Sequence, residues 1–161
     1  TLMLKGNNLK NNDFSGSDFN ESRINASYIE NSRFVGCDFS DAEVKSSELR
    51  TATFDGADFT GALFKTCHLN KSSFVGAKWG GTKFQHTALS DMVFDGEMTD
   101  CAFECITRTV RTVFRNVTFR NCFFKYCNLK KVQFENCRAD NISLAFLKNN
   151  KADISGIKPL E

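Results

Sequence analysis

Residues 51–69 read TATFDGADFTGALFKTCHL, and the large apolar side chains of this stretch lie five residues apart, at Phe54, Phe59, Phe64 and Leu69. An amphipathic helix repeats its apolar face about every 3.6 residues, and a half-buried strand repeats it about every two. A strict period of five fits neither element. The spacing therefore predicts a repeat architecture in which each five-residue unit buries one large side chain.

The same five-residue frame continues along most of the chain. Fourteen of the 17 phenylalanines lie in it, whereas an even distribution would place about one fifth of them there. The frame is interrupted once and then returns. Its large apolar members are Leu4, Leu9, Phe14, Phe19, Ile24, Ile29, Phe34, Phe39, Val44, Leu49, Phe54, Phe59, Phe64, Leu69, Phe74, Trp79, Phe84, Leu89, Phe94, Phe114, Phe119, Phe124, Leu129 and Phe134.

A small side chain stands two residues before most of these centres. A large and a small residue that both repeat at five predict that both point into a narrow, closely packed interior. The small residues include Ser17, Ser22, Ser27, Ser32, Cys37, Ala42, Ser47, Ala52, Ala57, Ala62, Cys67, Ser72, Ala77 and Thr82.

The repeated unit resembles the pentapeptide-repeat family. The family motif is a small residue, Asp or Asn, Leu or Phe, a small polar residue and a variable one, and ADFTG at 57–61 and CDFSD at 37–41 match it closely. The resemblance covers nearly the whole chain. It implies an all-β fold, a right-handed quadrilateral β-helix with four pentapeptides in each coil, and thus about eight coils of 20 residues.

The sequence supports a 20-residue coil independently of the resemblance. Residues that are 20 apart should stack on one wall of the helix, and they do segregate by type. One such series is entirely phenylalanine from 14 to 134 and ends near Ile154, and another is aliphatic. We therefore expect a single β-helix domain over 1–161, with an irregular coil or loop at 96–113 and a C-terminal cap at 145–161.

The segment 96–113 breaks the repeat, because its in-frame residues are Thr99, Glu104 and Thr109. Burial of these polar side chains in an apolar interior without hydrogen-bond partners would be unfavourable. Phe94 and Phe114 are nevertheless 20 residues apart, which is one full coil. We expect a distorted coil or an outward loop that conserves length, in which Phe103, Ile106 and Val110 pack in their own register. Two interpretations of this segment remain open: a functional loop on a rigid scaffold, and a degenerate repeat without a function of its own.

Basic residues accumulate in the C-terminal half, since 105–132 contains no acidic residue. Four of these residues follow a core centre directly and should therefore project outward on four successive walls as a belt. One interpretation is a solvated basic surface, and the other is a patch for a protein partner, because Arg and aromatic residues are common anchors. The candidate contact residues are Arg108, Arg111, Arg115, Arg120, Phe123, Lys125, Tyr126, Lys130 and Lys131.

Residues for catalysis or metal binding are few. His68 and His86 occupy positions expected to face outward, with no partner implied by their spacing. Most of the seven cysteines occupy the small inward position, their number is odd, and no in-frame pair lies one coil apart on the same wall. We predict no metal, no cofactor and no enzymatic activity within this chain, and the cysteine pattern favours a reducing compartment.

The predicted function is therefore a non-enzymatic scaffold for protein–protein interaction, as one domain of a larger bacterial protein such as a secreted effector. A formal net charge of +2 argues against a generally basic nucleic-acid binder. We expect a protein partner, no small-molecule substrate and no membrane span. The open ends of a β-helix also suit a homodimer. The expected location is the cytoplasm, or a host cell if the parent protein is secreted.

The family resemblance implies an alternative function. Some pentapeptide-repeat proteins are similar to duplex DNA in width and charge, bind DNA gyrase and protect it from quinolones. Such mimicry needs an acidic face to replace the phosphates. Asp18, Asp38 and Asp58 are 20 residues apart and could form an acidic column, but the wholly basic segment 105–132 weakens this alternative.

Overall fold

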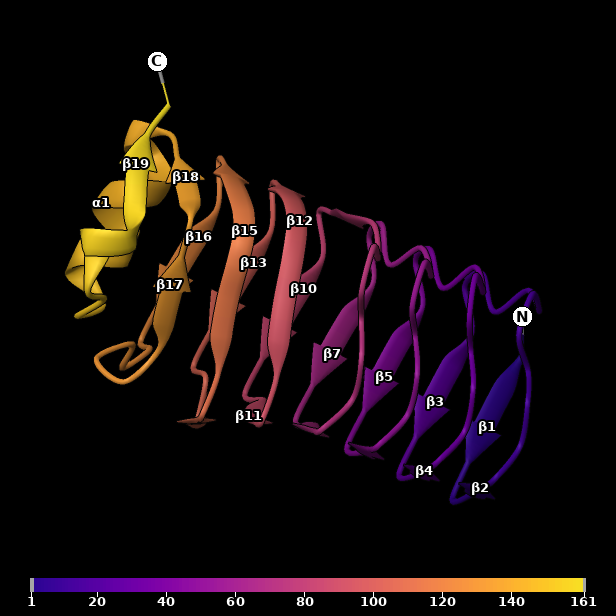
Figure 1. The fold of residues 1–161 in the computed structure, drawn as a ribbon. Coiled ribbons are helices and arrows are strands. Elements are labelled where there is room, and N and C mark those ends of the chain that lie inside the picture. The colour runs from indigo at the N-terminus through magenta and orange to yellow at the C-terminus, as the bar shows by residue number, and fades with distance from the viewer. Residues whose placement is uncertain (1, 161) are drawn as a thin grey trace.

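The computed structural model describes residues 2–160 as a β-helix of about eight coils, with the two ends of the chain at opposite ends of the helix (Figure 1). In each five-residue unit the centre points inward and its two neighbours point outward. The second residue after the centre turns the chain at a corner, commonly with a positive φ, as at Ser46 (50°) and Thr66 (55°). The chain therefore changes direction every five residues, as the sequence period predicts.

The first wall is a parallel sheet of seven strands, and each strand pairs with one from the next coil. Its pairing register joins Ile24 to Val44 and Val44 to Phe64. Its strands, in spatial order, are β1 (Met3–Lys5), β3 (Arg23–Asn25), β5 (Glu43–Lys45), β7 (Leu63–Lys65), β10 (Lys83–Gln85), β13 (Ala102–Glu104) and β16 (Phe123–Lys125).

The second wall is a parallel sheet of six strands, with the 20-residue register Ile29 to Leu49 to Leu69. It ends at β14, one coil earlier than the first sheet. Its strands are β2 (Asn8–Lys10), β4 (Tyr28–Glu30), β6 (Glu48–Arg50), β8 (His68–Asn70), β11 (Ala88–Ser90) and β14 (Arg108–Val110).

The third and fourth walls begin as isolated parallel bridges and become a continuous sheet in the C-terminal half. The bridges join Asp13, Arg33, Thr53 and Ser73 on the third wall, and Asp18, Asp38, Asp58 and Lys78 on the fourth. The sheet that follows contains β9 (Trp79–Gly80), β12 (Val93–Thr99), β15 (Val113–Arg120), β18 (Cys137–Ala139) and β19 (Ile157–Pro159), and β17 (Gln133–Glu135) also pairs with β15.

The interior is a set of stacked aromatic rings. Phe34 and Phe54 lie 5.0 Å apart between ring centroids with an interplanar angle of 7°, and Phe64 and Phe84 lie 5.1 Å apart at 5°. These side chains are at most 2% exposed. Each good ring pair adds about 0.5–1.5 kcal/mol beyond the burial of its apolar surface, so the stacks couple each coil to the next.

The segment 96–113 is a coil of the helix whose register changes twice. Met98 pairs with Trp79 across 19 residues and with Phe119 across 21, so one residue is missing between Phe94 and Met98. The in-frame Thr99 therefore points away from the core and Met98 replaces it, fully buried.

The second change restores the frame after Phe103, which pairs with Phe84 across 19 residues. Thr109 is again 20 residues from Leu89, so one extra residue is present between Phe103 and Thr109. Phe103 and Ile106 are buried, Val110 is only half-buried, and Glu104 is outside the core. The two shifts cancel, and the coil keeps its length of 20 residues.

The C-terminal end is covered by α1 (Asn141–Asn149), followed by the short helix η1 (Ile154–Gly156) and β19 (Figure 1). The helix begins four residues before the expected cap at 145–161. Its N-cap Asp140 accepts a hydrogen bond from the Ser143 backbone N–H at 2.9 Å. Leu147 is fully buried against the last coil, so α1 closes the apolar interior at this end.

Candidate functional site

Three of the predicted basic contact residues form ion pairs with acidic residues of adjacent coils. Arg111 pairs with Asp91, with Nη2 and Oδ2 2.9 Å apart. Arg115 Nε lies 2.7 Å from Glu135 Oε2 and Arg120 Nε lies 3.0 Å from Glu97 Oε1. Sequence reading missed these pairs because the acids lie outside the segment 105–132 and only the coil geometry brings them close.

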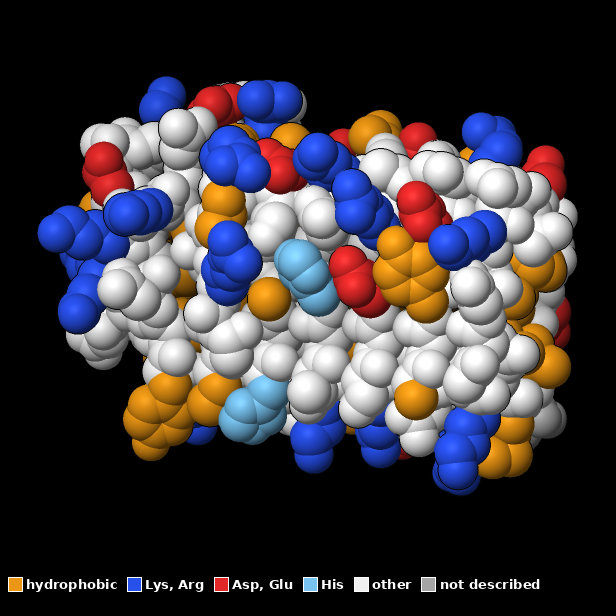
Figure 2. All heavy atoms as spheres, turned by 90° about the horizontal axis from the view of Figure 1, so that it is seen from below, with side chains coloured by type: hydrophobic (Ala, Val, Ile, Leu, Met, Phe, Trp, Pro, Cys, Tyr) orange, Lys and Arg blue, Asp and Glu red, His pale blue; other side chains and the backbone are white. Residues whose placement is uncertain are grey.

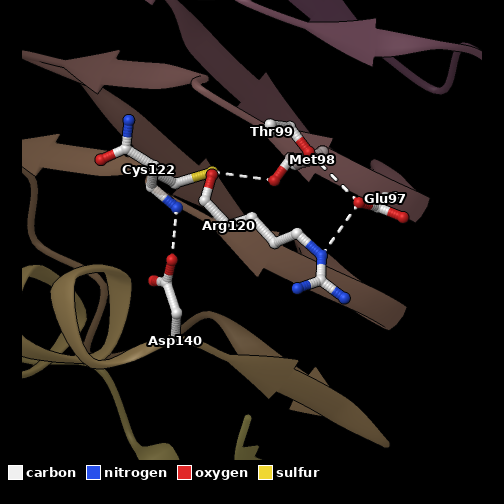
Figure 3. A network of polar contacts seen from close by, with 7 residues as sticks. Glu97, Met98, Thr99, Arg120, Cys122 and Asp140 are labelled. Carbon is white, nitrogen blue, oxygen red and sulfur yellow. Dashed lines mark hydrogen bonds and ion pairs between the residues drawn. The ribbon is translucent and has the colours of Figure 1, made fainter. Parts of the chain in front are cut away.

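Arg120 belongs to a polar network that joins two coils and the C-terminal cap (Figure 3). Glu97 accepts from Arg120 and from the Thr99 hydroxyl, at 3.0 and 3.3 Å. The backbone N–H of Asn121 donates to Asp140 at 2.7 Å. The position of Arg120 is thus explained by contacts within the protein.

The two aromatic candidates differ in their environment. Phe123 is half-buried and packs edge-on against Phe146 of α1, with ring centroids 5.1 Å apart. Tyr126 is 87% exposed at the corner after β16. Of these two residues, Tyr126 is the one whose apolar surface a partner could bury.

The remaining candidates are Arg108, Lys125, Tyr126, Lys130 and Lys131. We call this surface the basic face; it runs from Lys125 on the first sheet over the corner at Tyr126 to Arg108 on the second sheet. All five are exposed, and none forms an ion pair within residues 2–160. Figure 2 shows the side of the molecule that carries the second sheet, with Lys and Arg side chains gathered toward the C-terminal coils. Arg108, Lys130 and Lys131 line one hollow of about 270 Å³ on this face.

His68 has partners that its spacing did not suggest. Its Nε2 lies 3.1 Å from the hydroxyl of Ser90, and its Nδ1 lies 3.9 Å from a carboxylate oxygen of Glu48. Ser90 is two residues beyond one coil from His68, so the repeat frame gives no signal of the contact. A distance of 3.9 Å exceeds that of a hydrogen bond, so Glu48 does not fix the orientation of the imidazole.

The cysteines occupy the small inward position or the shifted coil, and all seven are free thiols. Cys101 lies outside the five-residue frame, and it comes next to Cys122 of the following coil. The missing residue in segment 96–113 produces this neighbourhood. The Cys122 thiol donates to Met98 O at 3.1 Å, and the Cys101 thiol donates to Thr99 O at 3.6 Å. The neighbouring Cys101 thiol and burial raise the pKa of Cys122.

The acidic column of Asp18, Asp38 and Asp58 forms as the period of 20 predicts, through parallel bridges. The column changes sign at the next coil, where Lys78 follows Asp58. Hydrogen bonds from the Ser40 side chain and backbone N–H lower the pKa of Asp38, so this carboxylate is charged at neutral pH.

No group of three or more His, Cys, Asp or Glu side chains suited to hold a metal ion occurs within residues 2–160. In the same part of the chain, no helix has the length and apolar character needed to span a bilayer.

Comparison with known proteins agrees with the coil geometry. Residues 32–70 and 47–85 match the model for pentapeptide repeats. Solved structures with similarity include QnrB1, a plasmid-mediated fluoroquinolone resistance protein, at 18% identity over 100% of this chain and 91% of that chain, with a TM-score of 0.45. A pentapeptide repeat protein of the Arabidopsis thaliana thylakoid lumen is 30% identical over 51% of this chain and 61% of that chain, with a TM-score of 0.41. The protein Rfr23 from the cyanobacterium Cyanothece 51142 is 13% identical over 75% and 86% of the two chains, with a TM-score of 0.40.

No curated protein sequence is significantly similar to this chain. The matched repeats, the five-residue frame on both sides of them and the stacked four-sided coils nevertheless agree with one another. The chain therefore contains pentapeptide repeats, which the family model matches over residues 32–85.

Proposed function

We propose that this chain is a non-enzymatic scaffold that binds a protein partner through the basic face. The observation that carries the proposal is the contrast between paired and unpaired cations in the C-terminal half. Arg111, Arg115 and Arg120 form ion pairs within the protein. The cations of the basic face form none within residues 2–160, and Tyr126 is 87% exposed.

Rigid presentation supports this proposal. The backbone below the basic face is held by stacked rings of the interior, such as Phe103 on Phe124 at 5.0 Å. Binding to a preorganised surface loses little conformational entropy of the scaffold. Exposed cations steer an acidic partner and set its register, and a central aromatic side chain supplies buried area.

The test is affinity capture with two variants of equal charge change. In the first, Arg108, Lys130 and Lys131 of the basic face are replaced by Glu. In the control, Lys5, Lys65 and Lys83 on the first sheet are replaced by Glu, and these three are equally exposed. We expect a partner that the wild type and the control retain and the first variant loses. Equal loss from both variants would show a nonspecific charge effect and contradict the proposal.

A second candidate function is DNA mimicry toward gyrase, which the column of Asp18, Asp38 and Asp58 favours. Its three carboxylates repeat about every 4.8 Å, and the corner acids Glu21 and Asp41 lie beside them in sequence. Inhibition of gyrase supercoiling by the wild type and its loss in Asp38→Lys would support this function. Inhibition that Asp38→Lys leaves unchanged, or none at all, would exclude it.

A further inference from the structure

We infer that the hollow between β14 and the loop 128–131 binds a tetrahedral oxyanion of the phosphate type. The hollow lies within the basic face, because Arg108, Lys130 and Lys131 line it, but the inference does not depend on the proposed function. It rests on a break in the second sheet, on unpaired backbone groups along that break, and on the charge of the side chains around it.

The second sheet stops one coil before the first. Up to β14 the ladder is regular, as shown by Lys71 N–H donating to Ser90 O at 3.1 Å and Asp91 N–H donating to Val110 O at 2.9 Å. The next bond of this series would run from Arg111 N–H to Lys130 O. It is not formed, nor is the bond from Asn128 N–H to Thr107 O, within the part of the chain that the structure describes.

The segment 128–131 carries a local turn, in which the Lys130 backbone N–H donates to the Asn128 side chain at 3.2 Å. The Leu129 N–H faces the following coil and donates to Asn150 O of the C-terminal cap at 2.9 Å. The in-frame Thr109 is polar and only half-buried, so little apolar attraction pulls the two coils together here.

The break leaves backbone donors without a strand partner. In a parallel ladder, alternate residues direct both N–H and C=O toward the same neighbour. Since Val110 faces the preceding coil, the N–H groups of Thr109 and Arg111 face the gap left by the missing strand, and that of Asn128 faces it from the other side. Thr109 and Asn128 also line the hollow. None of these three N–H groups has a hydrogen-bond acceptor among residues 2–160. Water satisfies such exposed groups in the free protein, and an anion that displaces the water can accept their hydrogen bonds instead.

The side chains around the hollow determine the charge of the ligand that can bind there. The lining contains three cations, two hydroxyls, one amide and one apolar side chain, with no carboxylate; its residues are Ile106, Thr107, Arg108, Thr109, Asn128, Lys130 and Lys131. Asp91, in the preceding coil, is already paired with Arg111. A volume of about 270 Å³ accommodates a phosphate group, whose oxygens can accept from Arg and Lys in charge-assisted hydrogen bonds.

The test is titration of the ¹⁵N-labelled protein with inorganic phosphate and, separately, with phenyl phosphate, against sodium chloride at matched ionic strength. We expect saturable amide shifts at Thr109, Arg111 and Asn128. Arg108→Ala should weaken binding about tenfold, in line with the loss of one charge-assisted hydrogen bond. Lys65→Ala, on the regular first sheet, should leave the affinity unchanged. The tighter of the two probes then identifies free anion or a phosphorylated molecule as the source.

Two results would overturn the inference. Shifts that do not saturate, or that also appear with chloride, would show general screening of surface charge. Saturable binding that Arg108→Ala and Lys65→Ala weaken equally would place the anion elsewhere. Unchanged amide shifts in the distant N-terminal coils of each variant serve as the check that it is folded.

Discussion

At the scale of the residue, the stacked phenylalanines dominate stability because each is buried among large neighbours. Phe54 is 2% exposed and stacks on Phe34 at 5.0 Å and Phe74 at 4.9 Å. Phe54→Ala should therefore lower the free energy of unfolding by about 3–5 kcal/mol. Urea denaturation measures this, with Val75→Ala, at a side chain 61% exposed, as the control. A loss below about 1 kcal/mol at Phe54 would contradict the aromatic interior.

The buried thiol of Cys67 predicts a pH dependence. Burial raises its pKa from 9.0 to about 11, although backbone hydrogen bonds at Ser47 and Lys65 oppose the shift. The unfolded chain loses this proton near pH 9 and the folded chain keeps it. The contribution to stability is therefore complete below pH 9 and is lost as the pH rises toward 11.

The corresponding measurement is urea denaturation of the wild type and Cys67→Ala at pH 8 and at pH 11. The wild type should lose stability over this range, and the variant should lose less, by about 2 kcal/mol at a scale of about 1.4 kcal/mol per pKa unit. Identical losses would mean that the Cys67 thiol ionises in the folded protein as it does in the unfolded chain.

At the scale of the element, the shifted register of the coil 96–113 predicts that Met98, and not Thr99, contributes to the stability of the core. In the shifted register Met98 is fully buried between Trp79 and Phe119. Met98→Ala should cost about 2–5 kcal/mol, while Thr99→Ala should change stability by less than about 1 kcal/mol. Thermal or urea unfolding of the two variants decides the register, because an unshifted frame would reverse the order of the two effects.

The C-terminal helix depends on its N-cap. Although burial raises the pKa of Asp140, hydrogen bonds from Ser143 and from the Asn121 backbone outweigh it and lower the pKa below 3.8. Asp140→Ala should destabilise the protein by about 0.5–2 kcal/mol, while Asp140→Asn keeps most of the cap. Hydrogen exchange across α1 checks this, since faster exchange in the alanine variant alone is expected. Equal exchange in both variants would show that the cap is unimportant.

Most of the strands and coils can be predicted from the sequence. The prediction fails at particular residues, and each failure has a physical reason. The large side chains of the frame must be buried, so the period of five and the coil of 20 follow from apolar spacing alone. The start of α1 four residues before the expected cap is a local event governed by Asp140 and Ser143. The register shift at Met98 arises because one residue is missing between Phe94 and Met98. A fixed five-residue frame cannot predict a missing residue.

At the scale of the whole molecule, the charge distribution on the folded surface differs from the one that the linear sequence suggests. A sequence segment without acids predicts a continuous basic belt, yet residues 20 or more positions away neutralise three of its arginines. The unpaired backbone groups of Thr109, Arg111 and Asn128 leave no sequence signal either. The location of the cations could be predicted, but which of them remain free depends on contacts between coils.

The central claim is that a partner binds the basic face rather than the acidic column. The most direct measurement is photo-crosslinking in cell lysate from a benzophenone amino acid placed at Tyr126, compared with the same group at Ser40, beside Asp38 on the fourth wall. We expect a discrete protein adduct from position 126 and none from position 40. An adduct from position 40 alone would contradict it and would favour an acidic, DNA-like contact surface.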